Sequence, residues 1–438
     1  MSSSNTAISK LRTVRSPQSN LHSTISQVSG NEIHPRAPLA DTVYADSPYT
    51  FQWNYEEQTS NLSPGKVIKL DIDQNVGDAS CFTIEFDFPD QDGSSVTINY
   101  APMVALACVK KLDVKYGNEL IHTFDRKQLY ELIMYVNEKE YRHHIIENFL
   151  GDAAPNGSTT VTNPGRVSLP IPMEGMNLQG GRESRTAPPV PINAIRGDFT
   201  VEVTLAPTSD YCDSSDGLPN FVRLWYKQLV TPDYLSMRTV TSSGGNSNEF
   251  YYPTRWYEAA AYDNKSLSSG SWYKQDISDL AIDGEMITML VHITTTSDDG
   301  NNLYFNHEPI EAIQLRLKNE EIVDIETPKA YQIEYFYNYY IKPYTWGSVK
   351  PASGEPNSLV TLSISERDLD YESYVGNGAN PDTKPMSLWI KSQSSITANI
   401  HVTAVYRAML DIDTAGTAHL VSNPYGFVGQ GQLGIGSM

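Results

Sequence analysis

The sequence predicts an all-β fold built from two antiparallel β-sandwiches, of jelly-roll or immunoglobulin-like type. The chain has 438 residues, more than a single hydrophobic core usually serves, so two domains are expected. It contains 27 Tyr and 12 Phe, and aromatic residues favour strands. At least fourteen strand-like segments follow one another with only one long helical segment. Parallel α/β folds need a crossover helix between strands and are therefore excluded.

An internal repeat supports two similar sandwiches. Val222–Val230 reads VRLWYKQLV and Val402–Leu410 reads VTAVYRAML, with Val first, Tyr fifth and a cation sixth in both. A looser pair lies upstream, where Lys111–Ile121 (KLDVKYGNELI) resembles Gln314–Val323 (QLRLKNEEIV). Each member of that pair is an alternating strand followed by a polar turn. Two copies of a β unit favour a duplicated β-domain.

Local patterns place the individual elements. Cys81–Phe88 alternates apolar and polar residues with a period of two, which is typical of a half-buried strand. A long helix is predicted from Asp125 to Phe149, because apolar residues recur there at helical spacing and Asp125 can cap the first turn. Gly151 and Pro155 then end it. The boundary between the two domains is expected near Thr231–Thr241.

Composition limits the partners and the compartment. The formal charge is −20, so the folded part should repel phosphate backbones, and sequence-specific binding of nucleic acid is not expected. Residues 1–36 are weakly basic and rich in Ser, as in a flexible arm. The three cysteines are widely spaced, which argues for folding in a reducing compartment. The sequence starts without an apolar secretory signal.

A search for chemistry finds no catalytic, nucleotide-binding or metalloprotease motif, so we expect neither enzyme activity nor a cofactor. Adjacent histidines on the predicted helix would face different directions and would not chelate one ion. Two pairs of carboxylates at alternate strand positions could bind Ca²⁺ or serve glycoside chemistry, but strand-edge solubility is the favoured interpretation. One acidic loop resembles a fragment of a calcium-binding loop but lacks the Glu that closes an EF-hand. These residues are His143, His144, Asp71, Asp73, Asp411, Asp413 and Ser297–Asn302.

Tyrosines at strand spacing suggest a buried interface. Alternate residues of Tyr331–Tyr340 would form an aromatic stripe on one face of a strand. Such a stripe favours sheet packing or a subunit interface over a platform for sugar stacking. The residues that we predict to contribute to interfaces are Tyr331, Tyr335, Tyr337, Tyr339, Trp225, Tyr226 and Tyr406.

Five segments of the chain carry patterns that are known together from one protein family. Lys111–Ile121 (KLDVKYGNELI), followed by the predicted helix, resembles a strand with an "IGGQ.ID" turn ahead of a helix, and Val167–Met173 (VSLPIPM) resembles an "IPLPF" segment. Phe221–Arg238 and Ala404–Leu420 resemble the strands that close a first and a second jelly roll, and Pro351–Ser358 (PASGEPNS) resembles a "PSG..N.S" loop. In these segments, taken in order, the chain resembles the double jelly-roll major capsid proteins of large icosahedral DNA viruses.

The resemblance implies two tandem eight-stranded antiparallel jelly rolls with one long helix inserted in the first. It divides the chain into a flexible arm (1–40), a first jelly roll (41–236), a second jelly roll (237–421) and a Gly-rich tail (422–438). It also implies a structural virion protein whose homotrimers form pseudo-hexagonal capsomers that tile an icosahedral shell. The implied partners are neighbouring capsomers and, through the terminal arms, minor capsid or cement proteins or an inner membrane. Synthesis and assembly would take place in the host cytoplasm.

Two other functions are compatible with the sequence. A carbohydrate-binding or carbohydrate-active β-sandwich would use Asp71 and Asp73, or exposed aromatic residues such as Trp256 and Trp272. A minor capsid protein or a spike would share the fold and trimeric state of a major capsid protein but would not form a hexagonal lattice.

Overall fold

The fold is described from a computed structural model. The structure describes residues 50–73, 76–89, 98–136, 149–151, 161–162, 164–173, 190–192, 195–230, 250–277, 280, 286–297, 310–317, 320–325, 359–363, 386–412 and 416–421. The predicted boundary near Thr231–Thr241 lies outside these residues. So do residues 1–49 and 422–438, which include the predicted arm and tail.

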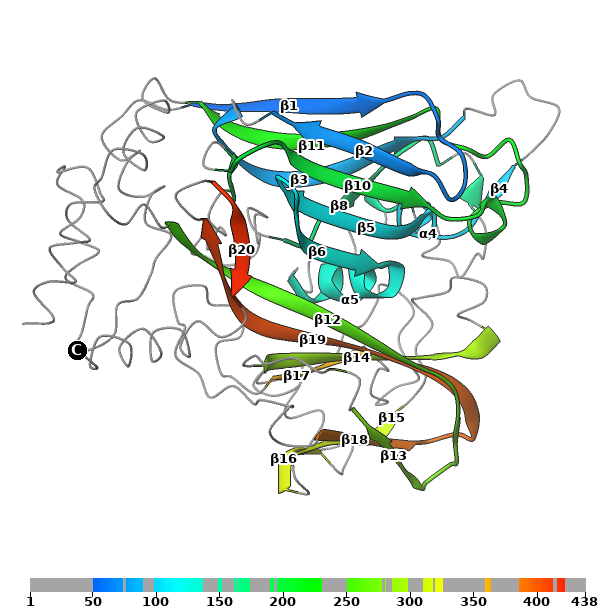
Figure 1. Ribbon diagram of the computed structural model, residues 1–438. Helices are drawn as coiled ribbons and strands as arrows, with labels where there is room; N and C mark the ends of the chain where they lie inside the picture. The colour runs from blue at the N-terminus through cyan, green and yellow to red at the C-terminus, as the bar shows by residue number, and fades with distance from the viewer. Residues whose placement is uncertain are drawn as a thin grey trace, which may run out of the picture.

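The first half of the chain forms a β-sandwich, which we call the first roll (Figure 1). One sheet has the strand order β1-β11-β3-β8, with β9 also paired to β3, and the other has the order β2-β10-β5-β6. All of these pairs are antiparallel. The strands are β1 (Thr50–Gln58), β2 (Val67–Ile72), β3 (Asp78–Asp87), β5 (Val109–Tyr116), β6 (Glu119–Asp125), β8 (Arg166–Pro170), β9 (Val190–Pro191), β10 (Phe199–Leu205) and β11 (Phe221–Val230).

The second half forms a second sandwich, the second roll. Its sheets have the orders β12-β19-β14-β17, with β20 paired to β19, and β13-β18-β15-β16. The strands are β12 (Phe250–Leu267), β13 (Trp272–Asp276), β14 (Met286–Thr295), β15 (Ile310–Leu317), β16 (Glu320–Ile325), β17 (Leu359–Ser363), β18 (Met386–Ser392), β19 (Ile396–Ile412) and β20 (Ala418–Val421). Smaller elements of the first half are β4 (Asn99–Tyr100), β7 (Val161–Thr162), the short helix α4 (Val104–Ala107) and the 3₁₀ turn Thr208–Asp210.

The two rolls have the same topology. The sheet β1-β11-β3-β8 of the first roll corresponds, strand by strand, to β12-β19-β14-β17 of the second. In the same way, the sheet β2-β10-β5-β6 corresponds to β13-β18-β15-β16. The repeat seen in the sequence follows this correspondence, because Val222–Val230 lies in β11 and Val402–Leu410 lies in the equivalent strand β19. The looser repeat falls on the equivalent hairpins β5–β6 and β15–β16. The predicted duplication and the double jelly-roll fold are therefore confirmed.

Alternation along the strands builds each core. In β3, Phe82, Ile84 and Phe86 are buried while Thr83 and Glu85 are only partly buried, as the period of two predicts. Phe82 stacks on Phe199 of the opposite sheet with 4.8 Å between ring centroids. The second roll has a core cluster of its own, which includes Met289, Val291 and Val402.

The helix α5 (Arg126–Val136) follows β6 directly. Asp125 caps it, because its Oδ1 accepts a hydrogen bond of 2.7 Å from the backbone N–H of Gln128. Leu129, Leu132 and Ile133 are fully buried on the packed face. The predicted start at Asp125 is thus confirmed, whereas residues 137–148 of the predicted helix lie outside the described part. Figure 1 shows α5 between the two rolls.

The turn between β5 and β6 gives a test of the packing. Gly117 has φ +63°, and a Cβ there would lie 2.4 Å from the carbonyl oxygen of Arg196. Gly117→Ala should therefore cost both the left-handed backbone penalty of about 1 kcal/mol and a steric clash. Gly65 has φ +73° with no atom within 4 Å of a Cβ, so Gly65→Ala is the matched control. We expect a clearly larger fall in the thermal unfolding midpoint for Gly117→Ala, and equal falls would contradict this packing.

Candidate functional site

The two rolls meet at a buried junction. Strand β6 and helix α5 of the first roll lie over the outer face of the sheet formed by β12, β19 and β14 (Figure 1). The large core cluster of the first roll continues across this boundary and includes Tyr257, Leu290 and Val405 of the second roll. Strand β20 also contacts β6, and the backbone N–H of Arg196 donates a hydrogen bond of 2.7 Å to the carbonyl oxygen of Gly416. The junction therefore fixes one roll against the other.

Aromatic rings fill the apolar part of the junction. The ring of Tyr257, in β12, lies 5.8 Å from the rings of both His122 and Phe124, in β6. On the helix, the ring of Tyr130 lies 5.3 Å from that of His292 in β14. All five side chains are buried. Contacts at such distances add to the energy gained from burying the rings.

An ionic cluster lies in the same junction. Nδ1 of His401, in β19, lies 2.6 Å from Oε1 of Glu131 in α5, and its Nε2 lies 3.3 Å from Oδ2 of Asp125. The side chain of Glu131 is fully buried, that of His401 is 3% exposed, and that of Asp125 is about half exposed. Glu131 and His401 are 270 residues apart in the sequence. The cluster therefore connects the helix of one roll to a central strand of the other.

Electrostatics keep His401 protonated. Burial alone would disfavour the charged imidazolium, but the attraction of Glu131 and the hydrogen bonds with Asp125 and Glu131 outweigh it and raise the pKa of His401 to about 10. Burial would raise the pKa of Asp125, but the hydrogen bond and charge of His401, together with the backbone N–H of Gln128 and the charge of Lys127, outweigh it, so the pKa of Asp125 is lowered. At neutral pH the junction thus contains a cation held between two carboxylates.

A second feature is the outer face of the β1-β11-β3-β8 sheet, where aromatic and cationic side chains alternate. The guanidinium of Arg223 lies 3.9 Å from the ring centroid of Phe221 and 4.8 Å from that of Tyr55. The ring of Tyr55 lies 4.8 Å from that of Trp225. Trp53 and Tyr55, on the edge strand β1, are 55% and 48% exposed. We call these five residues the aromatic face.

Acidic residues complete this surface. Trp225 donates a hydrogen bond of 2.7 Å from Nε1 to Oε2 of Glu85, and Arg223 forms ion pairs with Glu57 and Glu85. Large aromatic side chains are enriched in protein interfaces, and cations stacked on their rings add about 0.5 kcal/mol or more. The charged partners of these rings thus make the aromatic face compatible with water, while its aromatic residues give it the composition of a protein contact surface.

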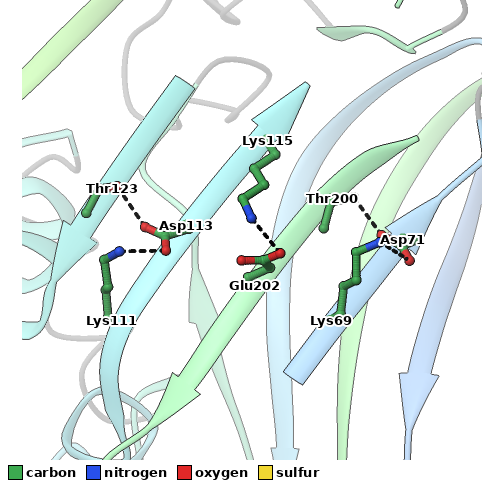
Figure 2. Close-up of polar contacts among 8 residues, drawn as sticks. All are labelled: Lys69, Asp71, Lys111, Asp113, Lys115, Thr123, Thr200 and Glu202. Atoms are coloured by element: carbon green, nitrogen blue, oxygen red, sulfur yellow. Dashed lines mark hydrogen bonds and ion pairs between the residues drawn. The ribbon is translucent and has the colours of Figure 1, made fainter. Parts of the chain in front are cut away.

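The outer face of the other sheet, β2-β10-β5-β6, is polar instead. Figure 2 shows paired side chains that cross its strands. Oδ1 of Asp113 accepts a hydrogen bond from Thr123 and its Oδ2 pairs with Lys111, both at 2.7 Å. Two further sets complete the row, with Lys115 Nζ 2.6 Å from Glu202 and with Asp71 between Thr200 (2.6 Å) and Lys69 (2.9 Å).

A polar pocket of about 570 Å³ opens beside this row, where the β5–β6 turn approaches the second roll. Its charged lining residues are Lys69, Arg196, Glu119 and Asp198. The two cations and two carboxylates balance, so the lining favours no ligand of one charge. We assign no binding role to it.

The predicted interface residues occupy different environments. Trp225 lies on the aromatic face, but Tyr226 and Tyr406 are 3% and 0% exposed and belong to the cores of the first and second rolls. Burial leaves the rings of Tyr226 and Tyr406 no surface for a second chain, so their expected interface role is corrected to core packing. The predicted interface residues that lie outside the described part of the chain are Tyr331, Tyr335, Tyr337 and Tyr339.

The residues considered for metal or sugar chemistry do not come together. Both carboxylate oxygens of Asp71 are engaged by Thr200 and Lys69. Trp256 packs against the core of the second roll. Among the residues that the structure describes there is no group of three or more potential metal ligands. Residues outside the described part include His143, His144, Asp413 and most of Ser297–Asn302.

The cysteines and helices give two further findings. Cys81, Cys108 and Cys212 are free thiols. Of the helices that are described, none has the length and apolar character that a membrane span requires.

Sequence reasoning missed the residues of both contact regions. His401 and Glu131 were not singled out, although a carboxylate within the apolar stripe of a helix was a usable signal. Trp53 and Tyr55 were also missed, although they alternate with Asn54 and Glu56 along β1, and this period of two could have placed both rings on one face of the strand.

Comparisons with known proteins agree with the topology. No protein-family model matches the sequence, and no curated protein matches it. The structure is similar to the PBCV-1 virus capsid (TM-score 0.61, 9% identity, covering 85% of this chain and 97% of that one). It is also similar to the Faustovirus major capsid protein (TM-score 0.53, 9% identity, covering 92% and 96%). At such low identity these likenesses establish the fold, which is the double jelly roll of viral capsid proteins.

The ionic cluster makes a pH-dependent prediction. Because the pKa of His401 is raised from 6.5 to about 10, its stabilising contribution is fully present below pH 6.5 and is lost as the pH rises through about 10. His401→Gln leaves Glu131 buried without its cation and should cost about 3 kcal/mol at pH 6. We expect the difference in thermal unfolding midpoint between wild type and variant to shrink steadily from pH 6.5 to 10.

The control for this prediction is His419→Gln, which changes an exposed histidine of β20. Its difference from wild type should be small at every pH. A difference for His401→Gln that does not vary with pH would contradict a protonated His401.

The polar row makes a different prediction, because its pairs are at the surface. In a double-mutant cycle, Lys115→Ala and Glu202→Ala should show a coupling of about 0.5 kcal/mol that falls in ~1 M salt. Chemical denaturation of the four proteins measures it. A coupling above about 2 kcal/mol would mean that water does not screen this face.

Proposed function

We propose that this protein is a structural virion protein, a major capsid protein. Three copies form a homotrimer with six similar jelly rolls around its axis, and these pseudo-hexagonal capsomers tile an icosahedral shell. The protein is made and assembled in the cytoplasm of the host and acts in the virion capsid, without enzyme activity or a cofactor.

One observation carries the proposal, namely that a single chain holds two rolls of the same strand order in a fixed arrangement. A lattice of hexagonal blocks needs six similar edges, and three such chains supply six rolls. The junction supports this role, because a block must keep its two rolls in one orientation while it meets its neighbours. The fold shared with the PBCV-1 and Faustovirus proteins supports it as well.

The proposed partners are other copies of the chain and neighbouring capsomers. The terminal segments 1–40 and 422–438 are proposed to contact minor capsid or cement proteins or an inner membrane. With a net charge of −20, the body of the chain is a poor ligand for nucleic acid.

The test is the size and shape of the purified protein. Light scattering after size-exclusion chromatography should give about three times the 48.8 kDa of the chain, because obligate interfaces of this class bury about 2,000 Å² or more. Electron micrographs should show pseudo-hexagonal blocks and, at high concentration, hexagonal arrays. A monomer at micromolar concentration would contradict the proposal, whereas trimers that never form arrays would favour a minor capsid protein or a spike.

A further inference from the structure

Strand register shows that Tyr55 and Tyr257 occupy equivalent positions in the two rolls. Tyr55 in β1 pairs with Trp225 in β11, and Tyr257 in β12 pairs with Val405 in β19. Trp225 and Val405 are themselves equivalent, because each directly precedes the tyrosine of the repeated segment. The aromatic face of the first roll thus corresponds to the face of the second roll that the junction buries.

The two equivalent faces differ in what covers them. Tyr257 is 7% exposed and Val405 is fully buried, because β6 and α5 lie over them. Tyr55, by contrast, is 48% exposed. The same surface of the same fold is therefore closed in one roll and open in the other, within the part of the chain that the structure describes.

The element that covers the second roll also has an equivalent. Phe124 of β6 faces Leu112 of β5, and Val323 of β16 faces Leu315 of β15. Because Leu112 and Leu315 are aligned in the repeat, Val323 stands at the register position of Phe124. The second roll therefore offers, in β16, the counterpart of the strand that buries Tyr257.

From this juxtaposition we propose that β16 of a second copy of the chain covers the aromatic face. The contact between copies repeats the contact within the chain, with Val323 of one copy near Tyr55 of the next. This inference rests on the proposed function, since it names the surfaces through which the copies of the trimer meet.

The proposed contact is head-to-tail, and this determines the assembly. A surface of the first roll meets a different surface of the second roll, so each copy retains one free surface of each kind until a ring closes. A ring of three copies then has six contacts of one type, three within chains and three between them. A two-fold contact would instead place the aromatic face against itself.

The composition of the aromatic face supports this assignment. Trp, Tyr and Arg are the residues that most often dominate the binding energy of an interface. On the aromatic face, Tyr55 contacts Trp225 and Arg223, and Trp53 occupies the next position on the same face of β1. Among the described strands of this sheet, β1 is the terminal one and pairs with β11 alone, so its other edge carries no strand of the sheet.

Disulfide trapping tests the pairing. Under mild oxidation, the variant with both Tyr55→Cys and Val323→Cys should give covalently linked dimers and trimers on a denaturing gel. Each single variant should give none beyond the wild-type background, which controls for the native cysteines. Linkage of Tyr55→Cys alone would show a two-fold contact and would overturn the inference.

Alanine variants test the energetics with a matched control. Trp53→Ala combined with Tyr55→Ala should raise the dissociation constant of the trimer at least tenfold while the circular dichroism spectrum stays unchanged. Val67→Ala removes an equally exposed apolar side chain (57%) from the other sheet and should leave the dissociation constant within about twofold.

The outcomes separate this inference from the proposed function. A wild-type protein that is monomeric would refute the capsomer itself. A trimeric wild type that forms no disulfide in the double-cysteine variant, and whose dissociation constant is unchanged by the alanine variants, would refute only the assignment of the aromatic face.

Discussion

The arrangement of the two rolls depends on one buried ionic cluster, in which His401 of the second roll lies between Glu131 and Asp125 of the first. Removing a carboxylate and an imidazolium from water costs several kcal/mol each, so the cluster is stable only when both rolls are in place. Either partner alone would leave an unpaired buried charge. Compared with an apolar replacement of the whole cluster it adds little net stability, but it selects one relative position of the rolls, because that position pairs His401 with both Glu131 and Asp125.

The sequence predicted the parts of this structure that local patterns control. The period of two in Cys81–Phe88, the cap at Asp125 and the repeated strand segments follow from rules that act over a few residues, and the structure agrees with them. The pairing of His401 with Glu131 could not be predicted, because 270 residues separate them and only the docking of whole rolls brings them together. The same limit explains the error at Tyr226 and Tyr406, since alternation gives a side chain's face but not which face is the core.

Duplication explains why both rolls share a topology and yet have different outer surfaces. At the position of His401 in the second roll, the first roll has Phe221, and Thr403 corresponds to Arg223 in the same alignment. The face that is closed during folding thus carries an ionisable group that needs a partner. The equivalent face that is open in the single chain carries rings shielded by a guanidinium and by the carboxylates of Glu57 and Glu85.

The difference between the junction face of the second roll and the aromatic face of the first roll fits the proposed order in which they are covered, the junction face during folding and the aromatic face during association. The junction forms as the chain folds, so its partners are always present and a buried charge pair is tolerated. A surface that is covered only after association with another molecule must first be stable in water. An exposed His–Glu pair would contribute little stabilising free energy on such a surface, because water screens it. Aromatic rings with paired charges at their edges remain soluble, and they release free energy when an apolar strand covers them. In the proposed assembly, the equivalent surfaces of the two rolls thus have different chemistries, one suited to folding within the chain and one suited to association between copies.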